Sequence, residues 1–374
     1  MVGVGHLGQH HARILASRGD VDLVGVADVR DEQVQAVARQ WNTRAYLDHR
    51  ELLPEVDAAV IAVPTVQHRA VASEFLERGI SVLVEKPLAT NLQDARYLAE
   101  LAARGRSIVQ VGHIERFNPA WLRLGQESVE PKFIQAERLG PYTFRSTDIG
   151  VVLDLMIHDL DLILHLVQSP ARRVEAMGVS VFGRHEDIAN ARIVFENGCI
   201  AELTASRVSY TARRRMQLWS AAGFAGIDFA GKTVTLVRPT DNLRRAGAVD
   251  APSLAPAELA RLREDVFGTY LERADLHPES DEPLAAEIGE FITCLQTGAR
   301  PRVGGAEACA VIALAEAVLT SLAVHQWEGT PAGPVGPYCL LPGEGIQGPH
   351  WQRQSQPIRE LQARPQFRPQ SGAA

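Results

Sequence analysis

Short apolar runs alternate with longer amphipathic runs through the first 118 residues, and this alternation constrains the fold more than any other feature. The apolar runs are rich in β-branched residues and suit strands buried on both faces of a parallel sheet. They span residues 23–27, 58–63, 81–84 and 107–111. The runs between them carry apolar residues at helical spacing and span residues 7–18, 32–41, 66–78 and 92–104. We therefore predict a doubly wound α/β domain over residues 1–118.

The pattern changes to a period of two from about residue 132. Alternating runs at residues 191–196 and 199–207 flank Asn197-Gly198, a strong hairpin signal because both residues of a type I′ turn need positive φ. Further strand-like runs cover residues 174–182, 215–221 and 233–238, and two helical runs cover residues 283–296 and 306–325. These features predict a second, α+β domain over residues 119–328 with a largely antiparallel open sheet.

Composition narrows the class of protein. The chain has 374 residues, of which 38 are basic and 45 acidic, so its net charge of −7 offers no electrostatic footprint for nucleic acid or an anionic membrane. Apolar runs such as residues 58–63 stop far short of a bilayer span, and no signal for secretion opens the chain. The four cysteines lack metal-ligand or redox spacing. We expect a soluble cytoplasmic protein without a structural metal, and a disordered tail rich in Pro, Gly and Gln at residues 329–374.

A glycine motif opens the first domain. Gly3, Gly5 and Gly8 enclose His6 and Leu7 in a G-x-G-x-x-G pattern, and Asp28 stands 20 residues past Gly8 at the end of the next predicted strand. Such glycines let the backbone approach a pyrophosphate at a helix N-terminus, while the acid binds the ribose hydroxyls. A glycine-rich turn beside an ordinary surface Asp is the alternative. A carboxylate here would repel a 2′-phosphate, so NAD is favoured over NADP, although Arg30 could soften that choice.

The first strand is short in this sequence. Only Met1 and Val2 precede Gly3, whereas a buried strand normally has about five or six residues. Either this strand is truncated in nature or translation starts upstream of Met1, and we expect the second.

Glu85-Lys86-Pro87 ends the fourth predicted strand, at the carboxyl edge where open α/β sheets place their ligands. Pro87 keeps Lys86 out of the helical region, so the lysine lies in an extended loop. It is either a functional cation or an ordinary surface lysine.

The run of residues 150–167 is apolar almost all round, which predicts a largely buried helix. Asp154, His158 and Asp161 nevertheless fall at i, i+4 and i+7, on one stripe of that helix. A carboxylate beside an imidazole raises its basicity and orients it, as in a proton shuttle. The alternative is a structural His–Asp pair. Asp159 lies off the stripe and is expected to serve structure or solvation.

These motifs occur together in a known order. The glycines, Pro64-Thr65 with His68 after the third strand, Glu85-Lys86-Pro87 and Asp154-x-x-x-His158 resemble the Gfo/Idh/MocA family of oxidoreductases over residues 1–327. The resemblance implies an N-terminal Rossmann domain that binds NAD. It implies that Lys86, Asp154 and His158 surround the carbon that exchanges hydride with the nicotinamide. The cofactor would be contacted by these further residues: Pro64, Thr65, His68, Glu85, Lys86 and Arg116. Arg116 could contact an anionic substrate instead of the cofactor, and a salt bridge at the domain junction is its alternative.

Residues 112–119 and 148–159 are similar to one branch of that family, whose members oxidise the 3-hydroxyl of UDP-N-acetylglucosamine to a ketone. In the mechanism that this resemblance implies, His158 accepts the hydroxyl proton, directly or through Lys86, and Asp154 holds the imidazole. Lys86 then stabilises the developing alkoxide.

Two alternatives concern substrate and class. The enzyme could act on an inositol or another polyol, which lacks a diphosphate, or the protein could be an NAD-binding regulator without turnover. Arg207, Arg213, Arg214 and Arg215 form either a basic strip for a diphosphate or a solvated sheet edge. The expected partners are a small-molecule substrate and further copies of the chain, because an open sheet can pair between subunits as a homodimer or homotetramer.

Overall fold

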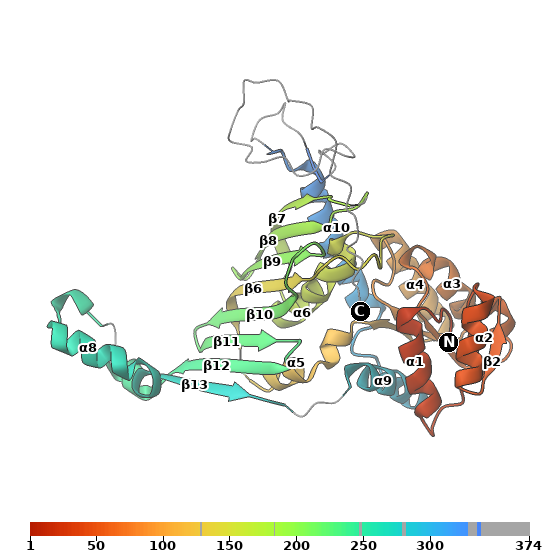
Figure 1. Ribbon diagram of the computed structural model, residues 1–374, viewed down its shortest axis with the longest axis horizontal. Coiled ribbons are helices and arrows are strands. Elements are labelled where there is room, and N and C mark those ends of the chain that lie inside the picture. The colour runs from red at the N-terminus through yellow and green to blue at the C-terminus, as the bar shows by residue number, and fades with distance from the viewer. Residues whose placement is uncertain (128, 183, 247–248, 279–281, 328–334, 338–374) are drawn as a thin grey trace, which may run out of the picture.

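The computed structural model describes residues 1–374 except 128, 183, 247–248, 279–281, 328–334 and 338–374. Two β-sheets with their helices make up the described chain (Figure 1). The expected disorder of residues 329–374 falls outside the described residues, apart from 335–337.

The N-terminal sheet is parallel, and the first residues of the chain complete its centre. Its strands are β1 (Gly25–Ala27), β2 (Arg44–Tyr46), β3 (Ala58–Ile61), β4 (Ser81–Glu85) and β5 (Val109–Gly112). β1 pairs with β2, and β3, β4 and β5 pair in that order. Val2 bridges Ala27 on one side and Ile61 on the other. Residues 1–3 therefore occupy the position of the central strand, which gives the order β2, β1, residues 1–3, β3, β4, β5.

Helices cover both faces of this sheet, as predicted. α1 (His6–Ser17), α2 (Asp31–Gln40) and α9 (Pro283–Thr297) share one apolar core with the sheet. α3 (His68–Leu76) and α4 (Leu92–Gly105) pack in the other core. Helix α9 comes from the far end of the chain, and its Phe291 and Ile288 are buried against α1. Each such side chain contributes about 1.5–3 kcal/mol, so residues beyond 118 help to stabilise the N-terminal core.

The second sheet has eight strands in the order β13-β12-β11-β10-β6-β9-β8-β7, and all its pairs are antiparallel except β6 with β9. The strands are β6 (Pro131–Leu139), β7 (Ala171–Val179), β8 (Ile188–Phe195), β9 (Ile200–Ser206), β10 (Arg213–Ser220), β11 (Gly223–Asp228), β12 (Thr233–Pro239) and β13 (Leu271–Leu276). The predicted fold class, a Rossmann-type parallel sheet followed by a largely antiparallel open sheet, is thus confirmed.

The predicted hairpin at Asn197-Gly198 joins β8 to β9, but its turn type differs from the prediction. Gly198 has φ of +84°, whereas Asn197 does not have a positive φ. The amide of Gly198 donates to the carbonyl of Phe195 at 3.0 Å. The connection therefore spans three residues, and such loops need positive φ only at the last position.

One face of the second sheet is covered by helices. A π-helical turn at Val152–Met156 leads into α6 (Ile157–Val167), and α10 (Gly305–Val324) packs on β7, α4 and α6 (Figure 1). α10 corrects the prediction about apolar runs: its 20 residues are long and apolar enough to cross a membrane by length and composition alone. Scanning for uninterrupted apolar runs missed it because Glu307 and Glu316 divide it. Its packing, with Val311, Ile312 and Val318 buried, is that of a core helix.

Three shorter helices lie outside these two layers. α5 (Pro119–Leu124) follows the N-terminal domain, and α7 (Asp241–Ala246) and α8 (Pro256–Asp265) form an arm that projects past β12 and β13 (Figure 1).

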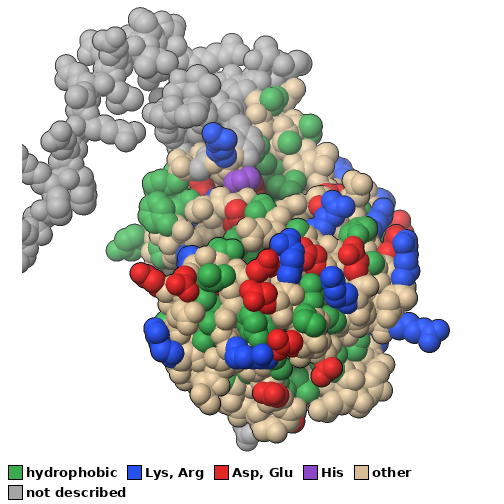
Figure 2. Space-filling view, turned by 90° about the vertical axis from the view of Figure 1, so that its right-hand side faces the viewer, with side chains coloured by type: hydrophobic (Ala, Val, Ile, Leu, Met, Phe, Trp, Pro, Cys, Tyr) green, Lys and Arg blue, Asp and Glu red, His purple; other side chains and the backbone are tan. Residues whose placement is uncertain are grey.

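Figure 2 shows the face of the N-terminal domain, on which acidic and basic side chains are interspersed.

Candidate active site

A cavity of about 1160 Å³ lies at the carboxyl ends of the N-terminal strands and reaches the second sheet. Its walls come from the turn before α1, the loops after β1, β3 and β4, the end of β6 and the start of β10. Open α/β sheets bind ligands at this edge. The cavity is therefore the candidate active site, formed jointly by both domains.

The glycine turn fits a bound pyrophosphate. Gly3 has φ of +80°, and a Cβ there would lie 2.6 Å from the carbonyl oxygen of Ala62. A Cβ on Gly8 would lie 1.9 Å from the carbonyl oxygen of Gly3, so any side chain would push α1 away from the sheet. Gly5, His6 and Leu7 line the cavity at the start of α1. No side chain in the described structure caps this helix, which leaves its first amides for an anion.

Asp28 lies in the cavity wall at the end of β1, as predicted. Its carboxylate accepts hydrogen bonds from the amides of Val4 at 2.9 Å and Arg30 at 3.0 Å, and the Arg30 guanidinium lies 3.2 Å away. Burial opposes ionisation, but the bonds from Arg30 and Val4 outweigh it and lower the pKa of Asp28. The charged carboxylate suits ribose hydroxyls, and Arg30 can approach a 2′-phosphate only by leaving Asp28.

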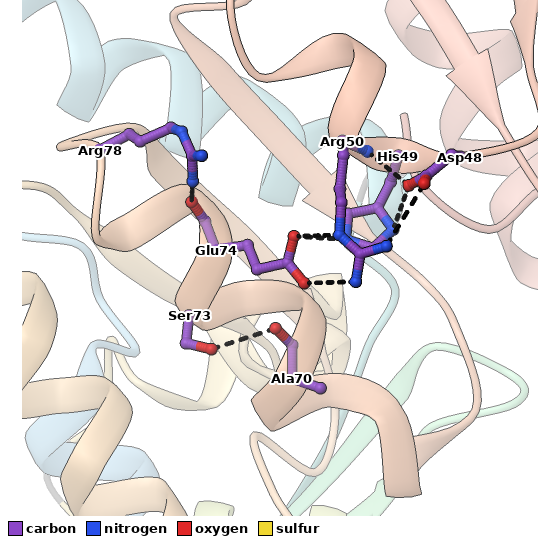
Figure 3. A network of polar contacts seen from close by, with 7 residues as sticks. All are labelled: Asp48, His49, Arg50, Ala70, Ser73, Glu74 and Arg78. Carbon is purple, nitrogen blue, oxygen red and sulfur yellow. Dashed lines mark hydrogen bonds and ion pairs between the residues drawn. The ribbon is translucent and has the colours of Figure 1, made fainter.

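A network of ion pairs fixes the loop beside Asp28 (Figure 3). Arg50 donates to both carboxylate oxygens of Glu74 on α3, at 2.9 and 3.1 Å, and Asp48 accepts from the Arg50 amide at 2.9 Å. Asp48, His49 and Arg50 all line the cavity. This wall of the cavity is thus anchored to α3.

Lys86 and Asp154 meet at the other end of the cavity. The Lys86 ammonium lies 2.9 Å from Oδ1 of Asp154 and 2.6 Å from the carbonyl oxygen of the same residue. The two side chains are 12% and 17% exposed, so the pair is largely shielded from bulk water. The expectation that Asp154 holds the His158 imidazole is wrong, because Asp154 holds Lys86 instead.

Only part of the predicted stripe faces the cavity, although His158 and Asp161 both lie in the regular helix α6. The π-helical turn at Val152–Met156 includes Asp154 and ends before His158. Asp154 and His158 line the cavity, whereas Asp161 points into the protein core and is fully buried. There its carboxylate accepts two hydrogen bonds from Arg116, at 2.6 and 3.1 Å.

His158 has a different environment from the one expected. Its Nδ1 atom is buried without a hydrogen-bond partner among the described residues, and its ring lies edge-on to His113 with centroids 6.3 Å apart. Burial, followed by the charges of Lys86 and Arg138, lowers the pKa of His158 well below its ordinary value. The imidazole is therefore neutral near pH 7 and free to accept a proton.

Four residues expected to bind the cofactor do not line the cavity: Gly8, Thr65, His68 and Arg116. Arg116 is 3% exposed and forms the salt bridge named above as its alternative. His68 lies between the carbonyl oxygens of Pro87, at 2.8 Å, and Val63, at 2.9 Å, so it joins the loops after β3 and β4. Pro64 and Glu85 do line the cavity. The Glu85 carboxylate contacts Nε2 of His11 at 2.7 Å.

Sequence reasoning missed Arg138, which lines the cavity from β6. Its guanidinium binds Glu115 at 2.7 Å and Asp159 at 2.8 Å. Burial opposes its charge, but the two carboxylates outweigh this and raise the pKa of Arg138. The signal was present, because Arg138 follows Ile134 and Ala136 on the inward parity of the strand. Asp159 thus has the structural role that was expected of it.

Comparison with known proteins agrees with this geometry. Residues 1–113 match the model of an oxidoreductase family with an NAD-binding Rossmann fold, and residues 109–225 match the GFO/IDH/MocA C-terminal domain. The chain is 36% identical over 296 residues to a UDP-N-acetylglucosamine 3-dehydrogenase of Acidithiobacillus ferrooxidans, an alignment that covers 79% of this chain and 87% of the relative. A solved structure of that enzyme superposes with a TM-score of 0.74 at 33% identity, covering 86% of this chain and 95% of the other.

A second relative acts on an inositol instead of a sugar nucleotide. The chain is 28% identical over 229 residues to a scyllo-inositol 2-dehydrogenase (NAD(+)) of Bacillus subtilis, covering 56% of this chain and 67% of the relative.

The fold, the glycine turn with Asp28, and the Lys86–Asp154 pair define an NAD-dependent dehydrogenase that acts on CH–OH groups. The chain belongs to the Gfo/Idh/MocA family of oxidoreductases, and within it to the sugar dehydrogenases.

Proposed function

We propose that this enzyme oxidises the 3-hydroxyl of UDP-N-acetylglucosamine to the 3-keto sugar with NAD as hydride acceptor. One observation carries the proposal: Lys86 and His158 line the same cavity as the glycine turn and Asp28. A cation and a neutral base thus share one chamber with the cofactor site. The similarity to the UDP-N-acetylglucosamine 3-dehydrogenase supports the choice of substrate.

Each residue in the site has a distinct role in this proposal. NAD, when bound, accepts the hydride from the carbon that is oxidised. The neutral imidazole of His158 accepts the hydroxyl proton, and its low pKa keeps it in the base form. Lys86 stabilises negative charge that develops on the substrate oxygen, which a preorganised cation does well in a shielded site. Asp154 positions Lys86 with its side chain and its carbonyl.

A substrate panel tests this function. Purified protein is incubated with NAD and, separately, with several UDP-sugars, myo-inositol and scyllo-inositol, while the absorbance of reduced cofactor is followed. Reduced cofactor with UDP-N-acetylglucosamine, and little with the inositols, is the expected result. Turnover of an inositol in preference to the UDP-sugar would instead support the second candidate, a polyol dehydrogenase like the relative from Bacillus subtilis. No reduction with any substrate would favour the NAD-binding regulator.

We also propose a cytoplasmic enzyme that forms a homodimer or homotetramer through its second sheet. Cys199, Cys294 and Cys309 are free thiols, which suits a reducing compartment. The helices α6 and α10 cover one face of the sheet, and Phe133, Trp219 and Phe224 cluster on strands β6, β10 and β11 with centroids 5.1 and 5.4 Å apart. Trp219 is 36% exposed, so this cluster offers apolar surface to a second copy.

A further inference from the structure

The charges around the cavity are unevenly compensated. Seven basic side chains line it: Arg30, Arg50, Lys86, Arg138, Arg145, Arg207 and Arg214. Five of these are in ion pairs with carboxylates. The side chains of Arg145 and Arg214 have neither an ion pair nor a hydrogen bond with any residue of the described chain, and both residues are exposed. Two guanidinium groups without an ion pair in the wall of one cavity, in a chain whose net charge is −7, attract an anionic ligand.

The register of the second sheet supports a ligand-binding role for Arg214. In the antiparallel pair of β6 and β10, Arg214 lies directly opposite Arg138. Side chains in that relation have Cβ atoms about 4.5–5.5 Å apart, and like charges there repel. Glu115 and Asp159 form ion pairs with Arg138, whereas no carboxylate of the described structure forms one with Arg214, although Asp159 lies within its electrostatic range. An anion bound beside Arg214 would remove this repulsion.

The neighbouring arginines of β10 have a different environment. Side chains alternate between the faces of a strand, so Arg213 and Arg215 project away from Arg214. Both bind Glu137, at 3.2 and 2.6 Å. Of the basic strip at residues 207–215, only Arg214 therefore combines a place in the cavity wall with a charge that is not yet paired.

Aromatic rings line the same cavity as these arginines. Tyr142 and Phe144 line the cavity from the segment between β6 and the π-helical turn, with centroids 4.8 Å apart. Phe144 is 75% exposed. The guanidinium of Arg207 lies 5.3 Å from the Tyr142 ring and donates to the carbonyl oxygens of Ser146 and Ile149, which positions this segment. Accessible aromatic rings in the same cavity as unpaired guanidinium groups suit a nucleobase that carries phosphates.

We propose that this wall is a nucleoside-diphosphate subsite, in which Arg145 and Arg214 bind the diphosphate and Tyr142 and Phe144 stack on the base. The proposal rests on the proposed function, since it assigns the part of the cavity that reads the UDP group of the sugar nucleotide. A sugar attached to that diphosphate reaches Lys86 and His158 in the same cavity. Arg214 is also among the charges that act on His158, so the two lie within electrostatic range.

Binding of UDP to the NAD-saturated protein tests the subsite by calorimetry, without any need for turnover. We expect UDP to bind, and Arg214→Gln and Arg145→Gln each to weaken it at least tenfold. Phe144→Ala weakens binding and Phe144→Trp restores it. Arg213→Gln is the matched control, because it removes an arginine from the same strand but the other face, and it leaves UDP affinity within twofold. Exposed positions are substituted in each case, and equal thermal melting of all variants checks that they fold.

Two outcomes overturn the subsite: failure of UDP to bind the NAD-saturated parent, or binding to both arginine variants within twofold of the parent. A failure of the proposed function looks different, because UDP would then bind with the expected dependence on Arg214 while UDP-N-acetylglucosamine yields no reduced cofactor. Where turnover is found, Arg214→Gln raises KM for UDP-N-acetylglucosamine at least tenfold and changes kcat by only a few-fold. A fall in kcat at constant KM contradicts a binding role.

Discussion

The ion pair between Lys86 and Asp154 makes a quantitative prediction about the chemical step. Lys86→Met keeps the aliphatic volume but removes the only ammonium that the described structure places beside Asp154, at 2.9 Å. Loss of an electrostatic stabiliser of this kind lowers turnover by about 10² or more. Asp154→Asn leaves Lys86 its bond to the carbonyl of residue 154, at 2.6 Å, so the lysine stays near its place and turnover falls by roughly tenfold to 10²-fold.

The double variant discriminates between positioning and independent action. If Asp154 acts through Lys86, the double variant is no slower than Lys86→Met alone, since residues that act as a unit are not additive. Single-turnover kinetics with saturating NAD and substrate measure the step. Calorimetry serves as the control: NAD affinity stays within a few-fold, because the glycine turn and Asp28 lie elsewhere in the cavity. Losses that multiply in the double variant, or more than a third of parental turnover in Lys86→Met, would refute this reasoning.

Three further predictions concern cofactor choice, stability and pH. NAD binds at least tenfold tighter than NADP, a difference of about 1.4 kcal/mol. Asp28→Ser reduces this difference in affinity because it releases Arg30 for a 2′-phosphate. Equal affinities of the parent for NAD and NADP in calorimetry would contradict the role of Asp28 in cofactor choice. Arg116→Ala lowers the free energy of unfolding by about 3–5 kcal/mol, because it leaves the buried Asp161 carboxylate unpaired. The folded variant keeps its NAD affinity. Unchanged urea unfolding together with weakened NAD binding would instead show that Arg116 is a cofactor ligand. Because the pKa of His158 lies well below its ordinary value, kcat/KM should fall only as pH drops below about 6.5. Arg214→Gln removes one of the cations that lower it, so the acid limb moves to higher pH; a shift to lower pH would contradict this assignment.

Local sequence patterns predicted most of the fold. The alternation of apolar and amphipathic runs predicted the doubly wound sheet, since each strand and helix lies within one short window of sequence. The period of two predicted the second sheet for the same reason. The two strand–loop features at the cavity, Gly3 to Gly8 and Glu85-Lys86, also lie within single windows, and most of their residues line the cavity.

Contacts between distant residues could not be predicted in this way. Arg116 and Asp161 are 45 positions apart, and the partner of each was decided by how η3 (Ile114–Phe117) packs on α6. The predicted stripe of Asp154, His158 and Asp161 failed at Asp161, whose carboxylate binds the distant Arg116 in the core instead of facing the cavity. The basicity expected of His158 depended on a regular helix that would bring the Asp154 carboxylate beside its imidazole.

The position from which hydride leaves the substrate tests the central claim most directly. UDP-N-acetylglucosamine deuterated at C3 is incubated with the protein and NAD, and the reduced cofactor is analysed by mass spectrometry. We predict one deuterium in the reduced cofactor from the C3-labelled sugar and none from sugars labelled at C2 or C4. Reduced cofactor that carries deuterium from another carbon, or no reduced cofactor at all under conditions where UDP binds, would contradict the proposed oxidation of the 3-hydroxyl.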